Sequence, residues 1–236
     1  MGVLGGAKVI SDRNTYSTVT MGPVDAPQAD SPQCRDISAA FPDKASGFRK
    51  VDVREPAPAG ATAYRNEQAV ELTIRCGVNA PDQFTQASIT EDHEGTQWLP
   101  IKDATPGSNL STYYTVGAGP VLAITSEADF SGALDDFSSA IASHTDAAAA
   151  PERKPYPMST QQPAKQANEK VCREFLSTLP DKLGDYSRVG SDDPAAAQAA
   201  ALSASYRADR HESVVVRCGL DMAKGYKAGE RLSLIH

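Results

Sequence analysis

The sequence predicts an α+β protein made of two related small domains in tandem, each with a short N-terminal helix and an antiparallel sheet. The first observation is an internal repeat that includes all four cysteines of the chain. The second is that each copy opens with the apolar spacing of a helix and continues with the alternation of strands. A chain of 236 residues has room for about two ordinary domains, so each copy is expected to be a domain.

The two copies correspond at their cysteines. Each copy contains, in the same order, a Cys, a Pro, a Tyr-Arg pair and an Arg-Cys-Gly motif. The cysteines are Cys34 and Cys76 in the first copy and Cys172 and Cys218 in the second. Widely separated cysteines lack the close spacing of zinc and thiol-redox motifs. We therefore expect one disulfide within each copy and an oxidising compartment, with buried free thiols as the alternative.

The first 33 residues are expected to precede the first domain. Residues 1–10 are apolar but soon give way to charged residues, so they are either a disordered terminus or the end of a longer membrane helix. Three prolines among Gly, Ser and Asp predict an extended leader over residues 11–33.

Residues 34–146 predict a complete first domain. Apolar spacing predicts a helix from Cys34 that ends before Pro42. Strands are expected over residues 48–53, 70–76, 111–116 and 120–125, and the strongest of them places Val70, Leu72, Ile74 and Cys76 inward. A closing helix, capped by Ser126 or Asp129, would carry one apolar face formed by Phe130, Leu134, Phe137 and Ile141.

The rest of the chain predicts a linker and a shorter second domain. Residues 147–166 are rich in Pro and Ala and are expected to form a flexible linker. Residues 167–236 repeat the first copy with a helix from Cys172 and a strand whose inward residues are Val214, Val216 and Cys218. One difference is an alanine-rich helix that is expected to start at Asp193 and Pro194. Counterparts of the later strands and of the closing helix are missing, so we expect an incomplete domain with exposed apolar surface.

The composition excludes some classes of function. A net charge of −7 without a cluster of Lys and Arg argues against nucleic-acid binding. No apolar run approaches the ~18 residues of a membrane span. The sequence also lacks the G-x-S-x-G, phosphate-loop and H-E-x-x-H motifs.

Each possible catalytic grouping has a simpler explanation. A cysteine nucleophile needs a nearby base, but the histidines do not repeat with the cysteines. Asp135 and Asp136 are neighbours on a helix and should point to different sides, and Asp192-Asp193 resembles a helix cap. The Glu-Asp-His-Glu run at residues 91–94 is either a metal site or a solvated turn. We expect no catalytic, cofactor or metal site.

Four residues are candidate ligand contacts. Arg75 and Arg217 occupy equivalent strand positions and, if they point outward, would hold a carboxylate or phosphate of an envelope polymer. The alternative is an ion pair across neighbouring strands. Trp98 and Tyr113, together with Tyr114, would form an aromatic platform for sugar rings, or else pack in the core.

Several motifs of the first copy resemble a known family. They are the run Arg75 to Pro81 (RCGVNAP), Trp98-Leu99, residues 105–108 (TPGS), residues 114–116 (YTV), Pro120-Val121 and the leader residues 29–34 (ADSPQC). These are similar to the actinobacterial domain of unknown function 3515, and most similar to its corynebacterial-type members. The resemblance covers residues 1–146 and, as a truncated second copy, residues 167–236.

The resemblance implies a protein held by one N-terminal membrane helix, with its domains outside the cytoplasmic membrane. It supplies no catalytic residue, cofactor or ligand. We therefore expect a non-catalytic envelope protein that binds or organises a cell-wall polymer or an envelope protein. The alternative is an envelope hydrolase or transferase, which a deep pocket with convergent polar groups would favour. Stable oxidation of both cysteine pairs would exclude a third option, a thiol-redox protein.

Overall fold

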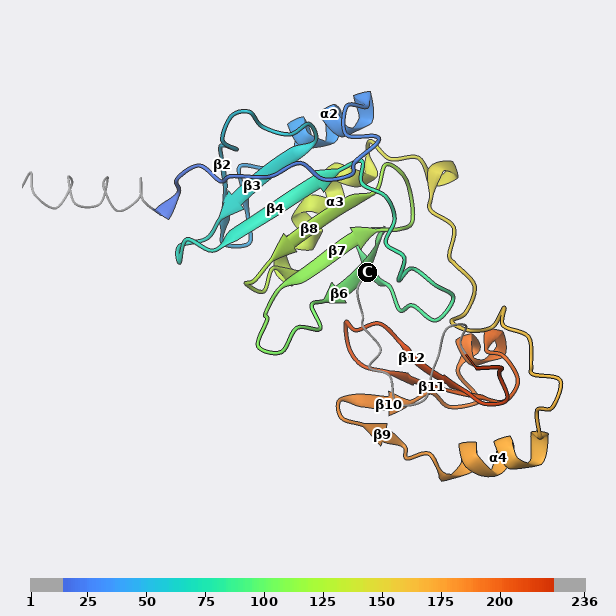
Figure 1. The fold of residues 1–236 in the computed structure, drawn as a ribbon. Coiled ribbons are helices and arrows are strands. Elements are labelled where there is room, and N and C mark those ends of the chain that lie inside the picture. The colour runs from blue at the N-terminus through green and yellow to red at the C-terminus, as the bar shows by residue number, and fades with distance from the viewer. Residues whose placement is uncertain (1–14, 223–236) are drawn as a thin grey trace, which may run out of the picture. The chain divides into compact units, whose positions relative to one another are not determined.

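The computed structural model describes residues 15–222, which divide into two compact units (Figure 1). The first unit holds most of residues 15–154 and the second most of residues 155–222. The predicted membrane-helix end at residues 1–10 lies outside the described residues, as does the chain beyond residue 222. Within residues 15–222, no helix has the length and apolar character that crossing a bilayer requires.

The first unit is built on an eight-stranded antiparallel sheet in the order β1-β2-β3-β4-β8-β7-β6-β5. The strands are β1 (Lys44–Ala45), β2 (Phe48–Val51), β3 (Ala61–Arg65), β4 (Glu71–Cys76), β5 (Glu91–His93), β6 (Thr96–Lys102), β7 (Ser111–Thr115) and β8 (Leu122–Ser126). The pairing of β4 with β8, in which Ile74 lies opposite Ile124, joins the early strands to the late ones. The α+β fold class is confirmed.

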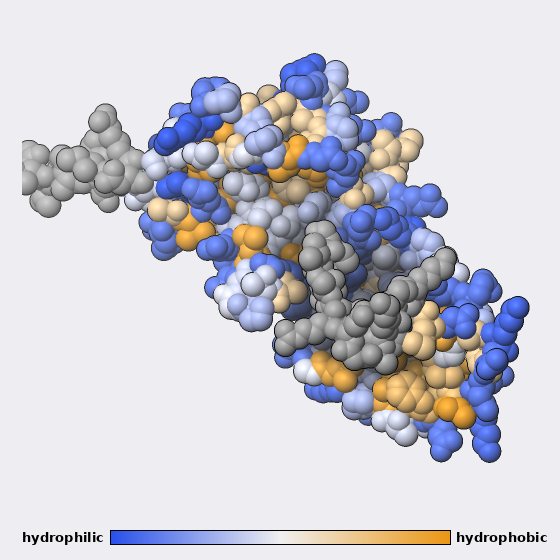
Figure 2. Space-filling view, viewed as in Figure 1, coloured by the Kyte–Doolittle hydropathy of each residue, from blue (hydrophilic) through white to orange (hydrophobic). Residues whose placement is uncertain are grey.

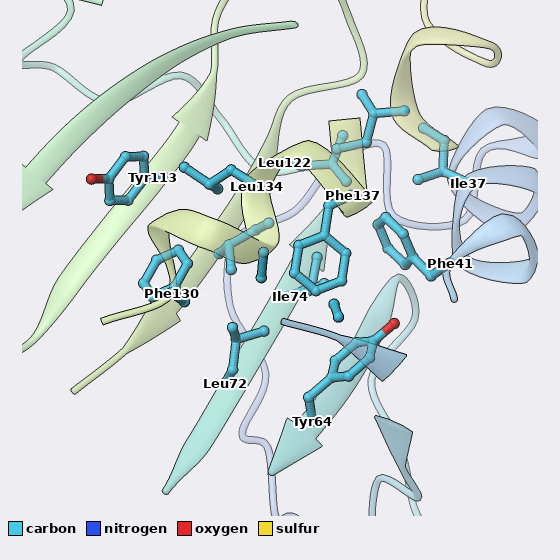
Figure 3. Close-up of a cluster of buried hydrophobic side chains, with 14 of the residues drawn as sticks. Ile37, Phe41, Tyr64, Leu72, Ile74, Tyr113, Leu122, Phe130, Leu134 and Phe137 are labelled. Carbon is cyan, nitrogen blue, oxygen red and sulfur yellow. The ribbon is translucent and has the colours of Figure 1, made fainter. Parts of the chain in front are cut away.

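The core lies between one face of this sheet and two helices, α2 (Pro32–Ala40) and α3 (Leu134–Ala142). Figure 3 shows Phe137 of α3 between Phe41 and Tyr64. Its ring packs edge-on against both, with centroid distances of 5.5 Å and 5.2 Å. Three of the four predicted inward positions, Leu72, Ile74 and Cys76, are buried, whereas Val70 is half-buried and lies just before β4. The apolar face predicted for the closing helix is buried at all four residues, so this part of the prediction is confirmed.

The two helices begin differently. The Ser31 hydroxyl accepts a hydrogen bond from the Cys34 amide and Pro32 occupies the first turn, which fits the predicted helix and its end before Pro42. A 3₁₀-helix, η1 (Ser131–Ala133), precedes α3, and its first amide is bonded by Asp129. The predicted cap at Asp129 therefore serves the 3₁₀ turn, whereas the N-cap residue of α3, Ala133, provides no side-chain hydrogen bond.

The β5–β6 hairpin was not predicted. Glu94 and Gly95 form its two-residue turn with φ angles of 48° and 78°, the left-handed pair of a type I′ turn. Three consecutive residues of β6, Trp98 to Pro100, are buried, because both faces of this strand are covered. Burial on both faces removes the alternation from which strands are recognised.

Two segments pack on the opposite face of the sheet, one along each side. On one side the leader lies over β2 and β3, where Val19 and Met21 pack against Ala63. Figure 1 shows this leader, in dark blue, crossing the sheet before it enters α2. On the other side Phe84 packs on Leu99 and Val116.

The second unit repeats the first half of this plan. Its sheet, in the order β12-β11-β10-β9, consists of β9 (Lys182–Leu183), β10 (Tyr186–Arg188), β11 (Ser203–Arg207) and β12 (Val214–Arg217), and its helix is α4 (Glu169–Thr178). The Tyr206 hydroxyl donates to the Pro180 carbonyl at 2.7 Å, as the Tyr64 hydroxyl does to Pro42.

The alanine-rich segment of the second unit forms a short 3₁₀-helix, η3 (Pro194–Gln198), and not the longer helix that was expected. The chain must turn back into β11 at Ser203, which leaves no length for further helical turns. Asp193, the predicted cap, forms an ion pair with Arg207 at 2.5 Å, so that carboxylate joins this segment to β11.

Candidate ligand-binding surface

Both predicted disulfides are formed. Cys34 of α2 is bonded to Cys76 of β4, and Cys172 of α4 to Cys218 directly after β12, with Cα–Cα distances of 5.6 Å and 5.5 Å. All four cysteines lie within residues 15–222 and none is free. The cysteine-nucleophile and thiol-redox hypotheses therefore have no thiol available, and the bonds are typical of an oxidising, extracytoplasmic compartment.

Arg75 and Arg217 perform the same structural task in the two units. The Arg75 guanidinium donates to the Gly22 carbonyl at 2.6 Å, and that of Arg217 donates to the Met158 carbonyl. Neither arginine forms the expected cross-strand ion pair in the described residues. The residues beside Arg75 on β3 and β8 are Ala61 and Ala123, which have no charge.

A second contact completes this arrangement in both units. The Gln28 amide donates to the Gly77 carbonyl at 3.1 Å, and the Ala164 amide donates to the Gly219 carbonyl at 2.8 Å. The segment before the first cysteine is thus held at two points six residues apart in each unit. Part of the predicted linker, from Met158 to Ala164, is therefore the leader of the second copy and is bound to its own sheet.

Trp98 and Tyr113 lie in the core. The Trp98 indole is fully buried and donates to the Ser138 hydroxyl at 2.9 Å, while Tyr113 is buried against Phe130 at a centroid distance of 5.2 Å. These two rings therefore do not form a sugar platform. Tyr114 points to the opposite face of the sheet, where partial burial raises the pKa of its hydroxyl.

Between the leader and Phe84, the opposite face of the sheet carries four half-buried polar side chains around buried Ala123, here called the central strip. Its members lie on β4, β8 and β7 and occupy two neighbouring rungs of the sheet: Thr73, Arg75, Ala123, Thr125 and Thr112. The Thr112 and Thr125 hydroxyls lie 2.9 Å apart and share a hydrogen bond. Figure 2 shows pale, weakly polar colours over the middle of the first unit.

Arg75 is the charged group of the central strip. Partial burial lowers its pKa, but a guanidinium remains protonated at any physiological pH. Its Nη1 is buried and has no hydrogen-bond partner among the described residues, and no described carboxylate forms a salt bridge with the guanidinium. The strip therefore combines a half-buried cation with three hydroxyl groups.

The comparison with known families agrees with the repeat. The family model described as "Protein of unknown function (DUF3515)" matches residues 1–150 and again residues 147–235. The chain belongs to the DUF3515 family. The second match begins within the predicted linker, as the contacts of the second leader also indicate. Neither the curated proteins nor the solved structures include a match to this DUF3515 chain.

The acidic surface of the DUF3515 chain lies on the outer side of α3. A shallow depression of about 610 Å³ is lined by residues that include Glu94, Asp135, Asp136 and His144. Asp135 lies 2.8 Å from His93 Nδ1, and Asp136 lies 3.4 Å from the Ser46 hydroxyl, so the two carboxylates point to different sides.

His93 lies beside this depression, where it contacts Asp135. Its Nδ1 contacts Asp135, and its Nε2 lies 3.5 Å from Glu91, so both ring nitrogens face carboxylates. This arrangement leaves no ring nitrogen for a substrate. Within residues 15–222 no group of His, Cys, Asp and Glu has the geometry of a metal site, and the run at residues 91–94 forms β5 and its turn.

The central strip was only partly visible in the sequence. The alternation in residues 70–76 placed Thr73 and Arg75 on the outward face, which is correct. The members from β7 and β8 were missed, because their position beside β4 depends on a strand pairing between residues about fifty apart in sequence. The same alternation in β7 would have separated buried Tyr113 from Tyr114.

Proposed function

We propose that this DUF3515 protein is an extracytoplasmic binding module that holds an anionic envelope polymer on the central strip of its first unit. In this proposal an N-terminal membrane helix tethers the module to the cytoplasmic membrane. The observation that carries the proposal is Arg75, a cation with no carboxylate partner among the described residues and with threonine hydroxyls beside it.

The chemistry of the strip favours a polymer that has both negative charges and hydroxyl groups. A guanidinium binds carboxylate and phosphate oxygens through charge-assisted hydrogen bonds, which are about twice as strong as neutral ones. The Thr73, Thr112 and Thr125 hydroxyls can donate to or accept from sugar hydroxyls. Because the members occupy neighbouring strands of one sheet, they fit an extended chain better than a small enclosed ligand.

The second unit does not repeat this chemistry. Arg217 has the position of Arg75, but Val215 stands where the first unit has Thr73. Residues 167–222 also contain no counterparts of β7 and β8. The proposal therefore assigns polymer binding to the first unit alone.

The test is a binding titration of the oxidised full chain against polygalacturonate, polyphosphate and neutral dextran, measured by calorimetry. We expect at least one of the two anionic polymers to bind and dextran to bind more weakly. Arg75→Gln should weaken binding about tenfold or more, since it removes a charge-assisted contact. Arg35→Gln removes an exposed guanidinium on α2 and is the matched control.

A second pair of variants separates ligand contact from loosening of the leader. Thr73→Val and Thr125→Val remove hydroxyls but leave the Arg75–Gly22 hydrogen bond intact. Each should weaken binding several-fold. Thr73→Val should leave the melting of the first unit unchanged, whereas Thr125→Val also removes the hydrogen bond to Thr112. Binding of neither anionic polymer, or equal affinity for Arg75→Gln and Arg35→Gln, would contradict the proposal. The tether is tested separately by fractionating native cells and adding protease from outside.

An envelope hydrolase or transferase is the second candidate, and the acidic depression beside α3 is the feature that favours it. Asp136 lines this depression, and its carboxylate has a long contact of 3.4 Å to the Ser46 hydroxyl. If this candidate is right, the full chain releases reducing ends or acyl groups from isolated wall polymer and Asp136→Asn abolishes the release. Equal release by the Asn variant would exclude Asp136 as the catalytic acid.

A further inference from the structure

The inner faces of the two sheets differ in how well they are covered. Three apolar positions of the first unit, Ile37, Ala45 and Leu72, are at most 1% exposed. At the equivalent positions of the second unit, the exposed fractions are 46% for Phe175, 38% for Leu183 and 40% for Val214. Figure 2 shows hydrophobic residues at the surface of the second unit. The helix α4 and the sheet of the second unit thus present exposed apolar residues where the first unit has a core.

Two elements cover this face in the first unit. The helix α3 contributes Leu134, Phe137 and Ile141 to the core, and Phe130 joins them from just before the 3₁₀-helix η1. The strand β8 pairs antiparallel with β4, so that Ile124 lies opposite Ile74 and Leu122 opposite Cys76. The strand β8 and the helix α3 are consecutive in the chain, which makes them a single strand-then-helix segment.

The second unit has neither of these elements within residues 155–222. Within the described residues its strand β12 pairs with β11 and forms the edge of the four-stranded sheet. This edge begins with three consecutive valines, Val214 to Val216. An apolar edge strand with unpaired backbone groups is a ready template for a further strand.

We propose that the second unit binds a polypeptide segment consisting of a β-strand followed by an amphipathic helix. The strand adds antiparallel to β12, and the helix lies over Phe175, Leu183 and Val214. This is strand addition to a sheet edge combined with helix packing, two established modes of peptide recognition. The inference concerns the second unit and does not depend on polymer binding by the first.

The first unit specifies what such a segment must look like. The strand needs alternating apolar residues facing Val214 and Val216, as Leu122 and Ile124 face their own sheet. The helix needs apolar residues at successive steps of four, three and four, which is the spacing of the apolar face of α3. Its outward positions are polar, as Asp135 and Asp136 are exposed on α3.

The probe is a fluorescent synthetic peptide with the sequence of residues 120–145, which copies β8 and α3. We expect saturable binding to the oxidised full chain by fluorescence anisotropy. Val214→Asp in the chain should weaken this binding at least tenfold. Val215→Thr is the matched control, because Val215 lies on the other face of β12 and threonine is the residue of the first unit at this position.

The peptide offers a second pair of variants. Phe137→Asp places a charge on the apolar face and should remove binding, whereas Asp136→Asn changes an exposed position and should leave it unchanged. Hydrogen exchange should show new protection of the β12 amides when the wild-type peptide is added. Together these readouts locate the peptide on both the edge strand and the inner face.

Three outcomes would overturn the proposal. The first is peptide binding that Val214→Asp does not weaken. The second is absence of binding together with β12 amides that are already protected in the free chain, which would mean that the chain covers this face itself. The third is self-association that Val214→Asp abolishes, which would make a second copy of this chain the occupant.

Discussion

Replacing Phe137 by alanine tests the core on which the first unit depends. The ring is fully buried and packs edge-on against Phe41 and Tyr64. Removing a buried phenylalanine costs about 3–5 kcal/mol, because transfer energy is lost and a cavity remains. The two aromatic contacts, each about 0.5–1.5 kcal/mol, favour the upper part of this range. We expect the free energy of unfolding of the first unit to fall by about 4 kcal/mol.

The chain contains its own reporter for this measurement. Trp98 is its single tryptophan and is buried in the first unit, so its fluorescence follows the unfolding of that unit. With a urea m-value of about 2 kcal/mol/M, Phe137→Ala should lower the urea midpoint by about 2 M. Phe175→Ala, at an exposed position of the second unit, is the control and should leave the midpoint unchanged. A loss below about 1 kcal/mol would show that Phe137 is not packed between the two rings.

Three further predictions use the same fluorescence. Gly77→Ala should lower the free energy of unfolding by more than about 2 kcal/mol, because φ is +80° and a Cβ would collide with the leader backbone. Gly107→Ala is the control: its φ is +82° but the space around it is open, so the loss should be only about 1–2 kcal/mol. Equal losses for the two variants would contradict the close approach of the leader. Replacing both Cys34 and Cys76 by alanine should lower the free energy of unfolding by about 4 kcal/mol, since the disulfide closes a loop of 42 residues. An unchanged urea midpoint would contradict a stabilising role of this disulfide. Burial raises the pKa of Tyr64, and the negative charge of Asp43 raises it further. The neutral hydroxyl therefore stabilises the first unit fully below pH ~10, and this stabilisation is lost as the pH rises above that value. Tyr64→Phe should flatten this alkaline decline in stability, and an unchanged slope would assign the decline to other groups.

Local periodicity explains why much of the first unit could be predicted. In residues 70–76 and in α3, one face is buried and the other is exposed to solvent. The apolar residues therefore recur every second residue in the strand and every three to four residues in the helix, and these two periods distinguish a strand from a helix. Where burial is two-sided, as in β6, the pattern disappears and the strand was missed. The alanine-rich segment failed for a different reason, since tertiary connection to β11 overrode its helix propensity.

The candidate site shows the same limit. Sequence alternation identified Arg75 as outward-facing, but its partner is the Gly22 carbonyl, which no residue-type argument could have named. Trp98 and Tyr113 were plausible sugar contacts by type, and their burial follows from packing against α3 and Phe130.

The sequence by itself determined the duplication, the two disulfides, the α+β class and the family, because these follow from spacing and local pattern along the chain. Only the tertiary structure decided that β4 meets β8, that each leader is fastened by an arginine to its own sheet, and that the central strip forms between two covering segments. These features depend on contacts between residues far apart in sequence. Such contacts are selected by the packing of whole layers, and no single segment encodes them.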